Sequence, residues 1–163
     1  PAVARSAPAA PPPPPADPLA DAQAAADRGD WAAARALAEA AAAADPLSAA
    51  AQQLLGQIYE QAGELDAALA AYRRSLYLDP ERALAALGMA NVWRQAGELA
   101  EARRGYRVAL RLLARHPAEE PVPGADGATA AELATYAQIQ LDMISAAPPC
   151  RDQDAPSPSG AAS

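Results

Sequence analysis

Three carboxamide side chains recur at a fixed distance along the chain: Gln23, Gln57 and Asn91 are 34 residues apart. A carboxamide both donates and accepts hydrogen bonds. A row of such groups can therefore hold the backbone of an extended peptide with little regard for the peptide's sequence. The alternative is that the three residues are ordinary solvated side chains.

Steps of three and four residues would place further side chains on the same helical face as the three carboxamides. We predict that this face lines a concave groove, and that its residues from the block of amides and its neighbour Arg94 bind a peptide or protein partner. The predicted binding residues are Gln23, Gln53, Gln57, Gln61, Asn91, Arg94 and Gln95, and the same face also carries Asp27, Glu60, Leu84 and Leu87.

The residue types that usually carry catalysis are too few and too scattered for an active site. The chain has one histidine, His116, which stands beside Pro117 at the end of a predicted helix, and one cysteine, Cys150. No spacing typical of metal ligands and no glycine-rich phosphate loop is present. The sequence therefore predicts binding rather than catalysis for this chain, with no metal and no cofactor.

The same 34-residue period appears at positions that shape the backbone, namely Gly29, Gly63 and Gly97. The second period also contains Leu55-Gly56, Tyr59, Ala68, Tyr72 and Pro80 at the spacing of a known helical repeat. These residues resemble the tetratricopeptide repeat, a helix–turn–helix unit that stacks to bury its apolar face. The fold class predicted from this resemblance is all-α, a solenoid of three helical hairpins followed by a C-terminal capping helix.

The pattern divides the chain into successive segments. A Pro/Ala-rich linker is predicted at 1–16, three repeat units within 17–117, a loop at 118–128, a capping helix at 129–146 and a disordered tail at 147–163. The repeat units are predicted at 15–48, 49–82 and 83–117, and their helices at about 18–28, 31–44, 48–62, 65–78, 81–96 and 99–115. Because its closing proline is displaced to Pro117, the last of these helices is expected to be about three residues longer than its equivalents.

Local signals fix the ends of several helices. Asp17, Asp30 and Ser48 are predicted N-caps, and Thr129 with Glu132 forms a predicted capping box. Large side chains are expected to fill the core between hairpins, and the capping helix is expected to turn its apolar positions inward. The predicted core aromatics are Tyr59, Tyr72, Trp93 and Tyr106, and the apolar positions of the capping helix are Leu133, Tyr136, Ala137, Ile139, Leu141 and Ile144.

Charge is unevenly distributed along this acidic chain. The net charge is −7, yet the third unit carries Arg94, Arg103, Arg104, Arg107, Arg111 and Arg115. An acidic chain is a poor general binder of nucleic acid, and no apolar run is long enough to span a membrane. The arginines could meet an acidic partner, or they could form a solvated helix face.

A longer stretch resembles a narrower family. The segments 72–80 and 106–113, followed by Val122-Pro123-Gly124-Ala125-Asp126-Gly127 and Thr129, resemble the C-terminal repeat region of chemotaxis-receptor methyltransferases. Ala128 and Ala131 replace the Leu and Gly usual there. The resemblance implies a parent S-adenosylmethionine-dependent protein-glutamate methyltransferase, whose catalytic domain is not in this chain.

By this resemblance the module would dock or regulate that enzyme, with a chemoreceptor, a regulator or its own catalytic domain as partner. The alternative is a free-standing tetratricopeptide scaffold in secretion or envelope assembly. A cytoplasmic location is expected from the first reading, and a periplasmic one stays open. The residues upstream of Pro1 would distinguish the two.

Overall fold

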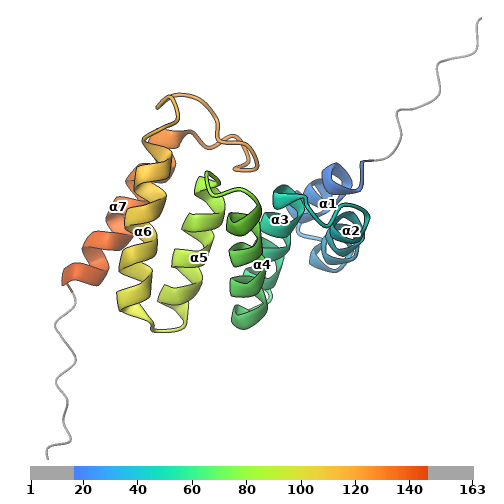
Figure 1. Ribbon diagram of the computed structural model, residues 1–163, viewed down its shortest axis with the longest axis horizontal. Helices are drawn as coiled ribbons and strands as arrows, with labels where there is room; N and C mark the ends of the chain where they lie inside the picture. The colour runs from blue at the N-terminus through green and yellow to red at the C-terminus, as the bar shows by residue number, and fades with distance from the viewer. Residues whose placement is uncertain (1–16, 147–163) are drawn as a thin grey trace, which may run out of the picture. The chain divides into compact units, whose positions relative to one another are not determined.

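The computed structural model describes residues 17–146, and every regular element in that range is an α-helix (Figure 1). The chain divides into two compact units, one ending at Leu78 and the other beginning at Asp79. The predicted all-α class of helical hairpins is confirmed. The predicted linker at 1–16 and tail at 147–163 lie outside the described residues. Within 17–146 no helix is both long enough and apolar enough to cross a bilayer.

The N-terminal unit consists of two hairpins. Its helices are α1 (Pro18–Asp27), α2 (Trp31–Ala44), α3 (Ala49–Gln61) and α4 (Leu65–Leu78). α1 packs on α2, α3 packs on α4, and α2 also contacts α3. α1 and α3 touch as well, so the first helices of the two hairpins are neighbours.

The C-terminal unit consists of one hairpin and one further helix. Its helices are α5 (Ala83–Gln95), α6 (Leu99–Leu113) and α7 (Ala130–Ala146). α6 packs on α5 on one side and on α7 on the other. In the connection before α7, an isolated antiparallel bridge pairs Pro121 with Thr129.

Each hairpin turns at a glycine in the left-handed region. The φ angles of Gly29, Gly63 and Gly97 are +75°, +75° and +82°. Residues with a Cβ atom rarely adopt this conformation, whereas glycine does so at little cost. The period seen in the sequence therefore marks the tight turn between the two helices of each hairpin.

The predicted helix caps are confirmed by their hydrogen bonds. The Asp17 carboxylate accepts from the Leu19 amide at 3.0 Å, and Asp30 and Ser48 accept from amides three residues on at 3.2 and 3.1 Å. At α7 the Thr129 amide donates to the Glu132 carboxylate at 2.8 Å, while the Glu132 amide donates to the Thr129 hydroxyl at 3.3 Å. This reciprocal pair satisfies two donors that the first turn of a helix leaves unpaired.

The cores of the hairpins differ in the size of their side chains. The buried residues of α1 and α2 are all alanines, namely Ala22, Ala25, Ala34, Ala38 and Ala41. The second and third hairpins bury larger groups, among them Leu54, Ile58, Tyr72, Val92, Tyr106 and Leu113. Since apolar area drives burial, the first hairpin has the weakest core of the three.

Two close approaches show why small residues occupy fixed slots. A Cβ atom placed on Gly56 would stand 2.6 Å from the Tyr72 ring, and one placed on Gly105 would stand 2.8 Å from the Ala90 Cβ. Contacts that short are not tolerated in a packed interior. The helices of these two hairpins therefore depend on a missing side chain, on the first helix in α3–α4 and on the second in α5–α6.

Two helix boundaries differ from the sequence prediction. α5 begins at Ala83 rather than near Glu81, because the Asp79 carboxylate accepts from the Glu81 amide at 3.1 Å and holds a turn there. α6 ends at Leu113 and is 15 residues long, against 14 for α4. The extra length was predicted to be about three residues, but the Arg115 and His116 amides bond three residues back and tighten the chain into a turn.

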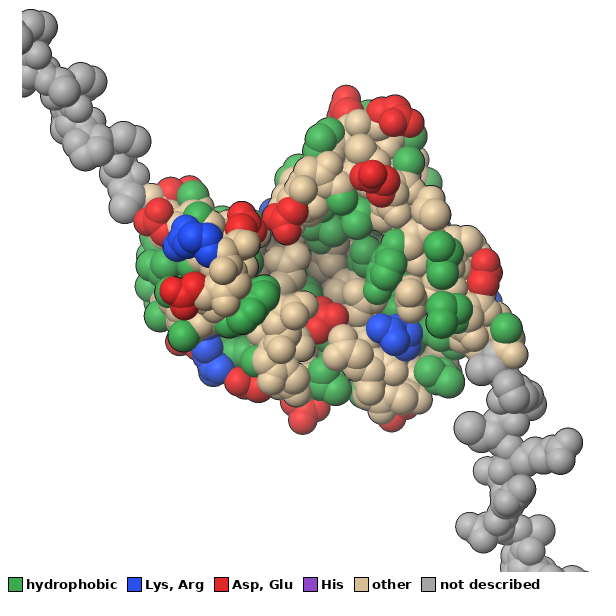
Figure 2. Space-filling view, turned by 180° about the vertical axis from the view of Figure 1, so that it is seen from behind, with side chains coloured by type: hydrophobic (Ala, Val, Ile, Leu, Met, Phe, Trp, Pro, Cys, Tyr) green, Lys and Arg blue, Asp and Glu red, His purple; other side chains and the backbone are tan. Residues whose placement is uncertain are grey.

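Some predicted core residues are not fully buried. Tyr72 and Tyr106 are buried as expected, whereas Tyr59 and Trp93 are only partly buried. On α7, Ala137 and Ile144 face inward, but Tyr136 and Ile139 are 37% and 51% exposed. Hydrophobic side chains are visible on the surface of the C-terminal unit in Figure 2. α7 packs on α6 alone among the helices of its unit, so only one side of it can be covered.

Candidate peptide-binding surface

The three recurring carboxamides lie on the first helix of each hairpin, as predicted. Gln23 is on α1, Gln57 on α3 and Asn91 on α5, and each side chain is partly buried. Gln61 and Gln95 are exposed at the ends of α3 and α5. We name these residues, with Arg94, the candidate surface, which has one part on each unit.

The three carboxamides make different hydrogen bonds. Gln23 Nε2 donates to the Asp27 carboxylate one turn later at 2.9 Å. Asn91 Oδ1 accepts from the hydroxyls of Tyr106 at 2.7 Å and Tyr136 at 3.1 Å. Within residues 17–146, the side chain of Gln57 has no hydrogen-bond partner. Gln57 is therefore the carboxamide whose donor and acceptor are both available to a ligand.

Other members of the predicted face are not accessible. Gln53 is only 4% exposed, and Leu84 and Leu87 are 8% and 5% exposed. These three side chains pack into their units rather than lining a surface, because they lie on the inward edge of α3 and α5. The prediction that Gln53 faces a ligand is therefore corrected.

A buried tyrosine reaches the candidate surface in the second hairpin. The Tyr72 hydroxyl donates to Glu60 Oε2 at 2.8 Å from a ring that is almost wholly buried. Burial, and then the nearby Glu60 carboxylate, hold the pKa of Tyr72 well above its usual value. The phenol therefore stays neutral and fixes the Glu60 carboxylate on α3.

The equivalent tyrosine of the third hairpin organises a larger cluster. Tyr106 lies 34 residues after Tyr72, and its hydroxyl donates to Asn91 and accepts from Arg94 Nε at 3.3 Å. The bond to Tyr106 raises the pKa of Arg94. Because Tyr136 also donates to Asn91, the cluster links α5, α6 and α7.

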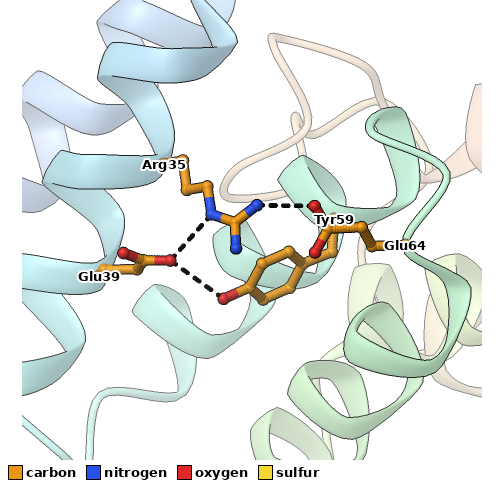
Figure 3. A network of polar contacts seen from close by, with 4 residues as sticks. All are labelled: Arg35, Glu39, Tyr59 and Glu64. Atoms are coloured by element: carbon orange, nitrogen blue, oxygen red, sulfur yellow. Dashed lines mark hydrogen bonds and ion pairs between the residues drawn. The ribbon is translucent and has the colours of Figure 1, made fainter.

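A polar network in the N-terminal unit was not predicted from the sequence (Figure 3). Arg35 on α2 pairs with Glu39 at 3.0 Å and with Glu64 at 2.7 Å, and its guanidinium carbon lies 4.9 Å from the centroid of the Tyr59 ring. The Tyr59 hydroxyl donates to Glu39 at 3.3 Å. Burial, and then the Glu39 charge, raise the pKa of Tyr59. The network joins α2 to α3 and to the turn before α4.

Only part of this network has a sequence signal. Arg35 and Glu39 are four residues apart, the spacing of a helical ion pair. Glu64 is 29 residues from Arg35, outside any local pattern. Within residues 17–146 no cluster of acidic, histidine or cysteine side chains could hold a metal ion.

Comparison with known proteins starts from the helices that carry this surface. Residues 19–83 match the family model of the tetratricopeptide repeat. This match covers α1 to α4 and the first residue of α5, and agrees with the resemblance seen in the sequence. No curated protein matches the chain.

Solved structures with the same fold include chaperones of type III secretion. SycD from Yersinia enterocolitica, in complex with a peptide of the translocator YopD, is 23% identical, with a TM-score of 0.68, over 78% of this chain and 89% of its own. PcrH, a Pseudomonas aeruginosa protein, in complex with the chaperone-binding region of PopD, is 23% identical, with a TM-score of 0.69, over 79% of this chain and 89% of its own.

A third similar structure has a different description. It is the O-GlcNAc transferase of Thermobaculum terrenum, 26% identical, with a TM-score of 0.57, over 58% of this chain and 18% of its own. Proteins with such different descriptions share tetratricopeptide-type hairpins. The similarities therefore establish the fold, an interaction module built of helical hairpins, and leave the partner to be argued from the surface.

Proposed function

We propose that this tetratricopeptide module holds an extended segment of a partner protein, in the manner of a secretion chaperone. The observation that carries the proposal is the fold shared with SycD and PcrH over 78% and 79% of this chain, since both were determined with a segment of a translocator protein. The module then belongs to the secretion alternative, and its partner is a protein destined for export.

The chemistry of the candidate surface supports a peptide ligand. Gln57 offers one acceptor and two donors that match the carbonyl and amide of an extended backbone. Gln61 on the next turn of α3 is exposed beside it. Such contacts recognise backbone geometry, so they suit a ligand that is unfolded when bound.

The methyltransferase reading draws no support from the comparisons. The residues that suggested it have a structural role here: the Val122 amide donates to the Ala128 carbonyl at 2.9 Å, and Thr129 and Glu132 cap α7. A Pro/Gly-rich turn followed by a capping box can arise wherever a loop must lead into a helix. The comparisons favour the secretion reading instead.

Site-specific photocrosslinking in the native host tests the proposal. A photoreactive residue at position 57 should capture an exported protein through an extended segment. The same residue at position 77 should not, because Tyr77 is 85% exposed on α4 and lies outside the candidate surface. Capture of a chemoreceptor or a methyltransferase domain at position 57 would favour the other reading. Equal capture at both positions would refute the surface.

Gln57→Ala is the matching loss-of-binding variant. We expect it to weaken binding of the captured segment by about 0.5–1.5 kcal/mol, the net value of one hydrogen bond. The melting temperature should not change, because Gln57 makes no hydrogen bond within residues 17–146. Titration calorimetry and circular dichroism on the same preparation separate the two effects.

A further inference from the structure

Four arginines follow one side of α6 and its C-terminal turn. Arg104, Arg107, Arg111 and Arg115 are separated by steps of three, four and four residues, and such steps place side chains on one helical face. All four are exposed, and the side chains of Arg104 and Arg115 are 71% and 61% accessible. We name this row the arginine stripe.

The two outer arginines are paired and the two inner ones are not. Arg104 bonds to Glu101 at 3.2 Å, and Arg115 pairs with Glu81. Among the described residues, Arg107 and Arg111 have no ion-pair or hydrogen-bond partner. Between them lies Val108, whose side chain is 37% exposed. The centre of the stripe is therefore an apolar contact flanked by two uncompensated positive charges.

Folding does not account for this arrangement. The buried side of α6 is formed by other residues, namely Ala102, Gly105, Tyr106, Ala109, Leu112 and Leu113. A cation in the last turn of a helix is favoured by the helix dipole, which explains Arg111 but not Arg107 in the middle. Like charges three or four residues apart repel each other, so the stripe costs stability unless something else binds it.

We propose that the outer face of α6, centred on Arg107, Val108 and Arg111, binds an acidic segment of a partner protein. An arginine can take a carboxylate through two parallel hydrogen bonds. Residues four apart on a helix are separated by about 6 Å along its axis. Carboxylates one helical turn apart, or two residues apart on a strand at about 6.6 Å, fit this spacing.

A protein segment fits better than a long polyanion. The whole chain has a net charge of −7 and an isoelectric point of about 4.6, which opposes nucleic acid and anionic membranes at a distance. Glu101 and Glu81 bound the open part of the stripe at both ends. The exposed valine adds an apolar contact that phosphate groups would not use. This surface is separate from the candidate surface on α1, α3 and α5 and does not rest on the proposed function.

Fluorescence anisotropy with the full chain tests the proposal. The probe is a labelled helical peptide that carries two glutamates one turn apart with a leucine between them, and its control is the same peptide with glutamines. We expect binding of the glutamate peptide only. Arg107→Glu with Arg111→Glu should weaken it by about tenfold or more, and the gentler Arg107→Gln with Arg111→Gln should weaken it less.

Arg73→Glu is the matched control variant. Arg73 lies 34 residues before Arg107, at the same position of α4, and is exposed. It should leave peptide binding unchanged. An equal loss in Arg73→Glu would show general charge attraction and overturn the proposal, as would unchanged binding in both double variants, provided that circular dichroism shows them folded. Tighter binding of duplex DNA, or of vesicles of phosphatidylserine with phosphatidylcholine, than of the peptide would also overturn it.

Discussion

At the scale of single residues, Asn91 shows how one carboxamide oxygen can hold three helices. It lies on α5 and accepts from a tyrosine of α6 and a tyrosine of α7. The Tyr106 ring is fully buried, so its hydroxyl would be costly to leave without a partner. A side chain predicted to contact a ligand thus also secures the C-terminal unit.

Asn91→Ala should therefore destabilise the protein by about 1–3 kcal/mol, the cost of leaving buried polar groups unsatisfied. Asn91→Asp keeps an oxygen acceptor of similar size and should cost less. Urea denaturation followed by circular dichroism measures both. If the two variants unfold at the same urea concentration as the parent chain, the cluster is not structurally important.

Glu132 makes a further prediction at this scale, on pH. Its hydrogen bond from the Thr129 amide, and then that from the Thr129 hydroxyl, lower its pKa below the ordinary value of 4.5. A carboxylate with a lowered folded-state pKa contributes stability above its unfolded pKa and loses it as the pH falls through the folded one. The start of α7 should therefore loosen below about pH 4.5. Carbon-detected NMR titration of the Glu132 carboxyl should give a midpoint below that value, and Glu132→Gln should abolish the pH dependence of the Thr129 amide signal.

Residue-level predictions from the sequence succeeded where the signal was local. The caps at Asp17, Asp30 and Ser48 follow from residues two or three positions away. The Arg35–Glu64 pair depends on how two hairpins meet, which no local pattern encodes. Gln53 was misplaced because the step of three and four defines a face of a helix but not how deeply that face is covered.

At the scale of elements, the spacing between paired helices is set by single missing side chains. Gly56 on α3 lies against the Tyr72 ring of α4, at a distance that leaves no room for a methyl group. Gly105 on α6 does the same against Ala90 of α5. The sequence indicated small residues at Gly56 and Ala90, but the role of Gly105 was not predicted.

Gly56→Ala should destabilise the protein by about 1–3 kcal/mol, because the added methyl group must displace the Tyr72 ring. The cost should fall when Tyr72 is also replaced by leucine, which leaves more space beside the backbone of α3. A double-mutant cycle measured by urea unfolding gives the coupling between the two positions. An identical cost of Gly56→Ala in both backgrounds would contradict this contact.

Most helices were predicted to within a residue or two of their ends. The bounds of α2 and α4 agree fully, since an N-terminal cap or turn glycine and a closing Asp-Pro define both. The errors lie at 79–82 and 114–116, where short-range hydrogen bonds replace the helical ones. Such turns depend on the path of the next segment and have no distinctive sequence.

At the scale of the whole molecule, stability is unequally distributed along the chain. The first hairpin buries only alanines, whereas the third buries Tyr106, Val92 and Leu113. Regions with little buried apolar area open most easily. The Arg35 network on the surface of the N-terminal unit is exposed to solvent and adds little to offset this.

Amides of α1 and α2 should exchange with solvent fastest, and those of α5 and α6 slowest. Hydrogen–deuterium exchange measured by mass spectrometry on the full chain tests this order. Ala38→Leu is not a suitable rescue, since Ala38 is fully buried and has no space beside it. Equal protection in all three hairpins would show that helix propensity, not core size, sets local stability.

The sequence predicted the architecture of the whole molecule better than its partner. A 34-residue period is a property of the chain itself, so the hairpins could be inferred directly. A partner leaves its mark only on exposed residues, where Gln57 and the arginine stripe compete with ordinary solvated side chains. The methyltransferase resemblance shows the difficulty, because its motif lies in a loop that serves the fold.

The opposite placement of Gly56 and Gly105 has a consequence for how such a gene can evolve. Joining α5 to α4 would bring the methyl group of Ala90 toward the aromatic ring that the first helix of that pair must avoid, while joining α3 to α6 would leave two facing glycines and a void. Recombination that cuts between hairpins preserves each matched couple, and recombination that cuts at the central turn breaks it. Duplication of this gene should therefore yield viable offspring in steps of two helices and not of one.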